Sequence, residues 1–342
     1  MHTEYSLLDG ANRIKDLVKK IKDSGMKACA ITDHGVMYGA VEFYKECKKN
    51  DIKPIIGCEV YMAPRSRFNK DANIDDKYGH LILLAKDNEG YQNLIKLVSL
   101  SFTEGYYYKP RIDMEILRKY SKGLICSSAC IAGFLSQALL NDEYEKAKNI
   151  ALEYIDIFGT EDFYIELQHN GLREQVLANQ RLIKLARELG LKLIATNDAH
   201  YLNREDSYSH EVLLCVQTGK KMIDEDRMRF GSDEFYIKTI DEMYDNFKNL
   251  PEALENTVEI ANKCNVEFEF GHTILPNFDT PENKDHYEFF KEECYKGLIE
   301  RYNIDALYNE EDKIKNLRED LYERLEYELS IIKKMGYVDY FL

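Results

Sequence analysis

The sequence has no long apolar segment. None of its hydrophobic runs approaches the roughly 18–20 residues that a membrane-spanning helix needs, and the N-terminus shows no basic-then-apolar signal pattern. These absences predict a cytoplasmic protein. The 342 residues, 44% hydrophobic and 31% charged, favour a soluble globular chain with one large α/β domain and a smaller one.

Several motifs of cysteine and nucleotide chemistry are missing. The eight cysteines lie mostly inside apolar stretches and form no CxxC pair; only Cys126 and Cys130 come near one another. This spacing favours reduced core thiols over a disulfide framework. The chain also lacks a phosphate-binding glycine loop of the Walker or Rossmann type and the nucleophile elbow of a serine hydrolase.

Positive charge is in deficit. Lys and Arg number 46 against 61 Asp and Glu, which gives a formal net charge of −15. Such a surface repels a phosphate backbone, because nucleic-acid affinity comes largely from Lys and Arg that displace counterions. A role near DNA would therefore need a local basic patch, a metal site or another domain. The same balance is compatible with an ordinary acidic enzyme.

Helix and strand patterns alternate along most of the chain. Apolar residues spaced three and four apart predict helices, and short apolar runs between them predict strands. Six or more such units favour helices around a parallel sheet that is closed or nearly closed into a barrel. The stretch 102–113 is expected to be an aromatic and basic loop. Helices are predicted at 10–23, 41–48, 88–101, 142–158 and 172–189, and strands at 26–32, 52–62, 80–85, 123–126, 163–167 and 191–196.

The character of the chain changes after about residue 270. Prolines and polar residues predict a linker over 271–285, and a charged helix with leucines every four residues, from Leu317 to Leu329, predicts a helical module over 286–342. The chain ends in the apolar segment Tyr340-Phe341-Leu342. That ending predicts that the natural protein continues further.

Two apolar runs end in Asp/His clusters. Asp33 and His34 follow the strand predicted at 26–32, and Asp198 and His200 follow the strand predicted at 191–196. Two residues apart on an extended segment, Asp198 and His200 project to the same side. Carboxylate and imidazole together suit zinc, manganese or iron at a site that activates water.

Further ionisable residues fall at predicted strand ends. A lone histidine there is often a hydrogen-bonded core residue, an Asp before a helix is usually a cap, and a carboxylate can pair with a neighbouring lysine. Because several such residues fall at the strand ends of one βα array, the sequence favours a shared metal site instead. His169 could line the same edge or be structural, and His210, His272 and His286 are expected to be incidental. The additional candidates are His2, Glu59, His80 and Cys130.

Six motifs distributed over essentially the whole chain carry a specific resemblance. They are the segments 2–10, 32–35, 57–61, 107–113, 197–201 and 230–235. Together they closely resemble the N-terminal region of bacterial C-family replicative DNA polymerases, the alpha subunits of DNA polymerase III. The resemblance implies a PHP (polymerase and histidinol phosphatase) domain over 1–270, of distorted (β/α)7-barrel type. It also implies that 286–342 begins the polymerase palm.

The resemblance implies a cluster of up to three divalent metal ions. Asp33 would then orient other groups and not ligate. The first motif of the family is His-x-His, and Met1 stands at its middle position with no histidine before it, so one metal position is expected to be weakened. The implied ligands are His2, Asp9, His34, Glu59, His80, Cys130, Asp198 and His200.

The implied function is that of a replicative DNA polymerase whose PHP domain is a metal-dependent 3′–5′ exonuclease, with His34, Asp198 and His200 catalytic. This stretch would lack the magnesium-binding carboxylates of polymerisation. DNA, the sliding clamp, the clamp loader and other replisome subunits would be partners of the full-length protein. One alternative is a non-catalytic scaffold that docks a separate proofreading subunit. Another is a free-standing phosphoesterase, which the loop 106–113 and the helical tail disfavour.

Overall fold

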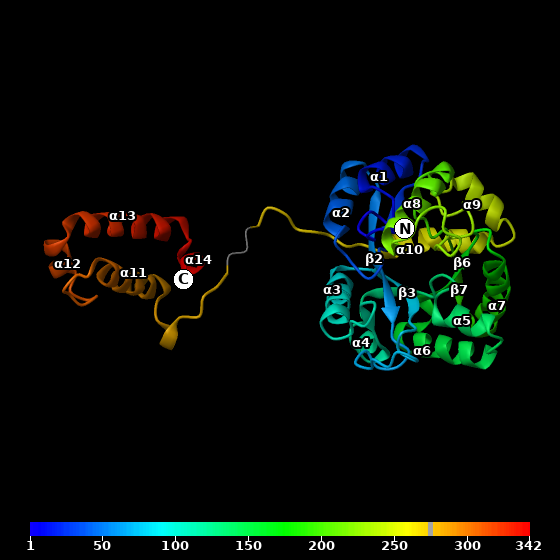
Figure 1. The fold of residues 1–342 in the computed structure, drawn as a ribbon, viewed down its shortest axis with the longest axis horizontal. Helices are drawn as coiled ribbons and strands as arrows, with labels where there is room; N and C mark the ends of the chain where they lie inside the picture. The colour runs from blue at the N-terminus through cyan, green and yellow to red at the C-terminus, as the bar shows by residue number, and fades with distance from the viewer. Residues whose placement is uncertain (273–275) are drawn as a thin grey trace. The chain divides into compact units, whose positions relative to one another are not determined.

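The computed structural model describes residues 1–272 and 276–342, and it divides into two compact units, Met1–Glu267 and Phe268–Leu342. Figure 1 shows the helices and strands of both units. Each unit has its own hydrophobic core. In the described part of the chain, no helix is both long and apolar enough to cross a membrane.

The first unit is built on one curled sheet of seven strands. The strand order is β1-β2-β3-β5-β6-β7, and the two-residue strand β4 pairs with β2. This arrangement confirms the predicted α/β class, and the predicted distorted barrel is a curled sheet with β1 and β7 at its two ends. The strands are β1 (Ala28–Ile31), β2 (Lys53–Met62), β3 (Gly79–Ala85), β4 (Arg111–Ile112), β5 (Leu124–Ser127), β6 (Phe163–Gln168) and β7 (Lys192–Thr196).

One strand differs from the predicted parallel sheet. β3 runs antiparallel to both of its neighbours, β2 and β5, while the other pairs are parallel. The reason is the connection between β2 and β3, residues 63–78, which contains no helix. Without a crossover element the chain turns back from the end of β2 and enters β3 in the opposite direction.

The N-terminal segment lies between the two edges of the sheet. In the described residues β1 and β7 do not pair with each other. Instead the Thr32 backbone N–H, just after β1, donates to Met1 O at 3.0 Å, and the His2 N–H donates to Ala199 O, just after β7, at 3.0 Å. The first residues of the chain thus connect the ends of the outermost strands.

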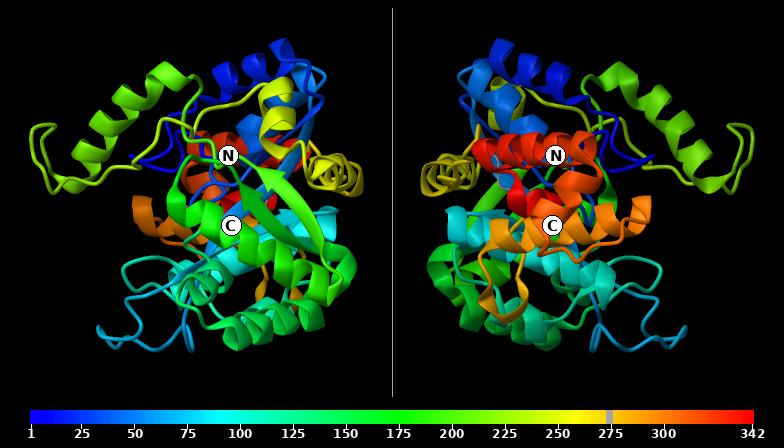
Figure 2. Two further views of the ribbon diagram at one scale, coloured as in Figure 1. Left: turned by 90° about the vertical axis from the view of Figure 1, so that its right-hand side faces the viewer. Right: turned by 90° about the vertical axis from the view of Figure 1, so that its left-hand side faces the viewer.

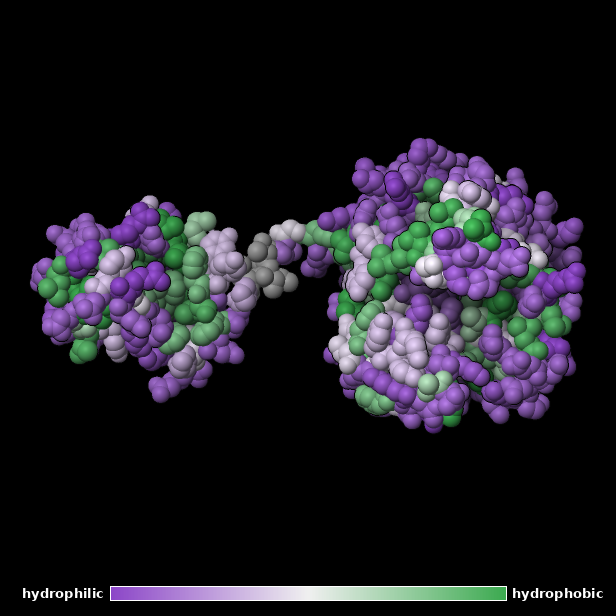
Figure 3. All heavy atoms as spheres, viewed as in Figure 1, coloured by the Kyte–Doolittle hydropathy of each residue, from purple (hydrophilic) through white to green (hydrophobic). Residues whose placement is uncertain are grey.

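Amphipathic helices cover the sheet (Figure 2). On α1, residues Ile14, Leu17, Val18 and Ile21 share one face and are all buried, whereas the outer helix surfaces are mainly hydrophilic (Figure 3). The interior packs Ile55, Leu84, Ile125, Tyr164 and Ile194 from five strands against Ile260. The helices are α1 (Ile14–Asp23), α2 (Ala40–Lys49), α3 (Asn88–Thr103), α4 (Met114–Lys119), α5 (Phe134–Leu140), α6 (Tyr144–Asp162), α7 (Arg173–Leu189), α8 (Ser207–Thr218), α9 (Ile240–Phe247) and α10 (Pro251–Lys263).

The second unit is helical. Its core joins Phe290, Tyr295, Ile314 and Leu329. The leucine repeat predicted as one helix is divided at Arg318, so Leu317 lies on a different helix from Leu329 and is exposed. The helices are α11 (His286–Tyr302), α12 (Glu311–Leu317), α13 (Glu319–Met335) and α14 (Val338–Phe341).

Candidate metal centre

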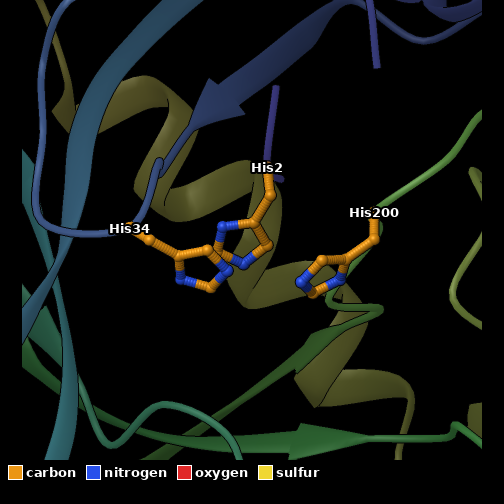
Figure 4. A group of neighbouring side chains, drawn as sticks. All are labelled: His2, His34 and His200. Carbon is orange, nitrogen blue, oxygen red and sulfur yellow. The ribbon is translucent and has the colours of Figure 1, made fainter. Parts of the chain in front are cut away.

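The structure brings the eight predicted ligands together at one edge of the sheet. Their donor atoms form three groups, each within 4.8 Å: His2, His34 and His200; Glu59, His80 and Cys130; and His2, Glu59 and Asp198. Because His2 and Glu59 each belong to two groups, the three are continuous. The rings of the first group converge from the N-terminal segment and from the segments after β1 and β7 (Figure 4). Asp9, the eighth, faces His34 with Oδ2 3.2 Å from Nε2.

The antiparallel direction of β3 places His80 in this cluster. His80 is near the start of β3 and pairs with Tyr61, near the end of β2. In a parallel strand, a residue at the start would lie at the opposite edge of the sheet from the ends of β1 and β7. Because β3 is reversed, His80 Nδ1 lies 2.9 Å from Glu59 Oε1 and 3.6 Å from Cys130 Sγ.

The N-terminal segment holds His2 rigidly. His2 is only 1% exposed, and its backbone carbonyl accepts a hydrogen bond from Asn12 Nδ2 at 2.8 Å. Gly10 passes so close that a side chain there would lie 2.1 Å from Thr3 O. Only glycine fits this approach. The ring of His2 is therefore placed by backbone contacts on both sides.

Asp33 holds the N-terminal loop through hydrogen bonds to its carboxylate. Its carboxylate accepts hydrogen bonds from the Thr3 backbone N–H at 2.6 Å, from Thr3 Oγ1 at 2.8 Å and from Ser6 Oγ at 2.7 Å. It is buried and lies outside the three donor groups. Its oxygens are thus used to hold the loop that carries His2 and Asp9.

His210 belongs to the centre, which corrects the expectation that it is incidental. It is 1% exposed on α8, and its Nε2 lies 3.5 Å from Asp9 Oδ1. Its ring packs against His200 with 5.6 Å between ring centres. No strand end or motif spacing marks this position, because a helical residue meets Asp9 only through the tertiary fold.

The other histidines lie elsewhere. His169 is exposed, and its ring faces Phe247 at 6.5 Å. His272 is exposed, and His286 bonds Asp339 within the second unit. The structure therefore does not bring His169 into the cluster. All eight cysteines are unpaired.

Burial and neighbouring charges lower the pKa of some histidines in the centre and raise that of another. Burial, with His34 and His200 nearby, lowers the pKa of His2 to about 3, and burial also lowers the pKa of His200. Burial opposes protonation of His34 as well, but Glu59 and Asp9 outweigh it and raise its pKa to about 10. In the metal-free protein, His34 thus carries a proton that a metal ion would replace.

The carboxylates stay ionised. Burial raises the pKa of Glu59 and of Asp9, but histidines outweigh it and hold both below their ordinary values: His80 and His34 for Glu59, His210 and His34 for Asp9. Asp198, bonded to His2 Nε2 at 2.9 Å, has its pKa lowered to about 2 despite burial. Three ionised carboxylates in one buried cluster require nearby positive charge.

The donor set fits divalent metal ions. Four buried polar atoms in the cluster make no hydrogen bond of good geometry among the described residues, although Asp9 lies within ion-pair distance of His34 and His210. They are His2 Nδ1, His34 Nε2, Asp9 Oδ1 and His210 Nε2. Buried polar atoms in proteins normally have hydrogen-bond partners. Several polar atoms that converge without such partners therefore indicate a ligand. Imidazole, carboxylate and thiolate together suit zinc, manganese or iron.

Known proteins resemble this chain both in its first half and along its full length. Residues 1–170 match the family model described as the PHP domain. Along its full length the chain is 47% identical to DNA polymerase III subunit alpha of Borreliella burgdorferi and 42% identical to that of Treponema pallidum. The chain is therefore homologous to DNA polymerase III alpha subunits and carries a PHP domain.

The chain spans less than a third of these relatives, 29% of the first and 28% of the second. Among solved structures, an amidohydrolase from Chromobacterium violaceum aligns with 58% of this chain and 85% of its own, at 14% identity and a TM-score of 0.38. That likeness is too faint to bear on function.

Proposed function

We propose that the chain is part of a replicative DNA polymerase, and that its PHP domain is a metal-dependent phosphodiesterase that removes nucleotides from a 3′ end of DNA. The observation that carries the proposal is the set of eight converging ligand-type side chains, all of them buried or half-buried. A domain kept only as a scaffold has no need of so many uncompensated buried polar groups.

The proposed ligands are His2, Asp9, His34, Glu59, His80, Cys130, Asp198 and His200. Bound zinc, manganese or iron would supply a nucleophile at neutral pH and neutralise charge on the phosphate. The domain assignment of 1–270 as PHP domain, 271–285 as linker and 286–342 as the start of the palm belongs to the same proposal. So do magnesium-dependent polymerisation and the replisome partners of the full-length protein.

The chain's own contacts prepare the donors. His200 Nδ1 lies 2.7 Å from the carbonyl oxygen of Asp198, so Nδ1 carries the proton and Nε2 presents its lone pair to the site. Glu59 Oε1 accepts from Nδ1 of both His34, at 2.7 Å, and His80, at 2.9 Å. Both rings are thereby oriented by one buried carboxylate. His34, Asp198 and His200 are the proposed catalytic residues.

The test is hydrolysis of a single-stranded oligonucleotide by the full-length protein, with zinc, manganese or iron supplied in turn. Asp198→Asn should lower the rate by at least about 100-fold, because it removes a carboxylate at the centre. Asp241→Asn, on the exposed start of α9, is the control and should match the parent. Primer extension should be the same in all three proteins, which shows that the polymerase is folded.

Two results would contradict the proposal. Equal hydrolysis by the parent and Asp198→Asn would show that the nuclease lies elsewhere. Metal bound at stoichiometric amounts without hydrolysis in the parent would favour the structural alternative, a scaffold for a separate proofreading subunit.

A further inference from the structure

A short aromatic and basic hairpin, residues 105–110, lies beside the metal centre. The Tyr107 backbone N–H donates to Lys109 O at 3.0 Å, and Tyr108 between them has a positive φ of 58°. Pro110 packs on Gly35, the residue that follows His34: a side chain at Gly35 would lie 2.9 Å from Pro110 Cγ. The hairpin therefore adjoins the loop that carries a proposed catalytic residue.

A buried arginine fixes the hairpin in place. Arg111 is fully buried and donates to four backbone carbonyl oxygens: Gly105 at 3.1 Å, Asp75 at 2.8 Å, Asn69 at 3.0 Å and Arg67 at 3.2 Å. Its guanidinium also lies 5.1 Å from the ring centre of Tyr107. The hairpin and the loop after β2 are thus held as one unit. A tyrosine with positive φ persists only where its surroundings hold it.

The hairpin combines a half-buried cation, Lys109, with exposed aromatic rings. Lys109 Nζ lies 5.4 Å from the ring centre of Tyr61, and that ring lies 5.2 Å from the ring of His80. In the part of the chain that the structure describes, Lys109 contacts the Tyr61 ring and forms no ion pair with a carboxylate. Tyr106 and Tyr108 are 53% and 64% exposed. The rings of Phe102 and Tyr106 stack 6.1 Å apart.

We propose that this hairpin binds the single strand that enters the metal centre, with Lys109 on a backbone phosphate and Tyr106 and Tyr108 against bases. The inference rests on the proposed nuclease function and names its substrate contact. An unpaired ammonium beside a centre of three carboxylates complements the charge of a phosphate that must approach them. Exposed rings on a fixed support offer stacking that every base accepts.

The test measures binding and hydrolysis separately. Binding is followed by fluorescence anisotropy of a labelled single-stranded DNA oligonucleotide whose 3′-terminal linkages are phosphorothioate. Lys109→Ala should weaken binding about tenfold and reduce the slope of log affinity against log salt by about 0.7. Tyr108→Ala should weaken binding by a similar factor without changing the slope, because stacking displaces no counterion. Lys109→Arg should retain both affinity and slope.

The matched control is Lys184→Ala. Lys184 is exposed on α7 and contacts a tyrosine ring in the same way, with Nζ 4.8 Å from the ring centre of Tyr144. The Lys184→Ala variant should bind the oligonucleotide with the affinity of the parent protein. Hydrolysis of bis(p-nitrophenyl) phosphate, which is too small to reach the hairpin, reports whether the metal centre of the parent protein is active, and it should be unchanged in Lys184→Ala.

The outcomes separate the two proposals. If the parent hydrolyses neither substrate, the nuclease proposal fails, while the anisotropy still decides whether the hairpin binds DNA. Unchanged affinity in Lys109→Ala overturns the hairpin assignment. So does an unchanged salt slope with reduced affinity, because it indicates a structural effect. If Lys109→Ala and Tyr108→Ala lose the same affinity for a duplex of the same length as for the single strand, the assignment to a single strand is overturned.

Discussion

At the scale of single residues, the metal centre depends on groups that only position others. Asp33 is the clearest case, because the hydrogen bonds of its carboxylate go to Thr3 and Ser6 and none goes to a side chain of the donor groups. Carboxylates that accept several hydrogen bonds in a buried place cannot be replaced by an amide without conflict, since the amide nitrogen would face other donors.

We therefore expect Asp33→Asn to destabilise the first unit by about 2–4 kcal/mol and to reduce its bound metal. The measurements are urea unfolding and elemental analysis of the purified protein. Asp23→Asn, at the exposed end of α1 where it pairs with Lys19, should change neither. Full metal content with unchanged stability in Asp33→Asn would contradict a positioning role.

Proton competition at His34 and Cys130 predicts how metal affinity varies with pH. His34 has a pKa raised to about 10, and burial with Asp198 and Glu59 nearby raises that of the Cys130 thiol well above its ordinary value. Each ligand gives up its proton on binding metal, so affinity should rise about tenfold per pH unit for each proton released. Calorimetry in buffers of different ionisation enthalpy counts those protons. A pH-independent affinity between 6 and 9 would contradict this ligand set.

At the scale of elements, the loops around the centre are fixed by side chains that bond to backbone. Arg111 ties the loop after β2 to the hairpin 105–110 through four carbonyl oxygens. The sequence predicts an aromatic and basic loop over 102–113. Instead this stretch contains the end of α3, the hairpin and β4, and Arg111 is fully buried.

Arg111→Lys should lower the stability of the first unit by about 3 kcal/mol, because an ammonium cannot reach all four acceptors and leaves buried carbonyls unsatisfied. Limited proteolysis should then cut the segment 63–78 faster. Arg118→Lys, whose half-exposed guanidinium pairs with Asp156, is the control and should behave like the parent. Equal cleavage of all three proteins would contradict the bracing role of Arg111.

At the scale of the whole chain, the metal centre joins segments that are distant in sequence. Its ligands come from the N-terminal segment, from β2 and β3, and from the ends of β1, β5 and β7. Bound metal therefore adds cross-links that hold both edges of the sheet together. Among the described residues, all members of the donor groups belong to the first unit, and the second unit has its own core.

Chelation should accordingly lower the melting temperature of the first unit and leave that of the second unchanged. At metal concentrations a hundredfold above the dissociation constant, the loss corresponds to about 2.7 kcal/mol. Differential scanning calorimetry with and without chelator measures both transitions, and added zinc or manganese should restore the first. A first transition that is insensitive to chelator would contradict a metal centre in the native protein.

The sequence alone determined most of the strands, several of the helices and most of the ligand types. Apolar periodicity is local, so it was sufficient to predict α1 from Ile14 to Ile21 and the strands that end near His34 and Asp198. Resemblance to the C-family polymerases then supplied the remaining ligands, which the structure brings to one edge of the sheet. Neither argument could supply the direction of a strand or the contacts of a helix with a distant loop.

Those features were decided only by the tertiary structure. The connection after β2 contains no helix, so β3 reverses and His80 reaches Glu59 from the start of its strand. His210 meets Asp9 because α8 packs over the N-terminal segment, and no local pattern records that contact. Local spacing fixes which way a side chain points from its own element. Whether two such side chains meet depends on how the chain between them crosses the sheet.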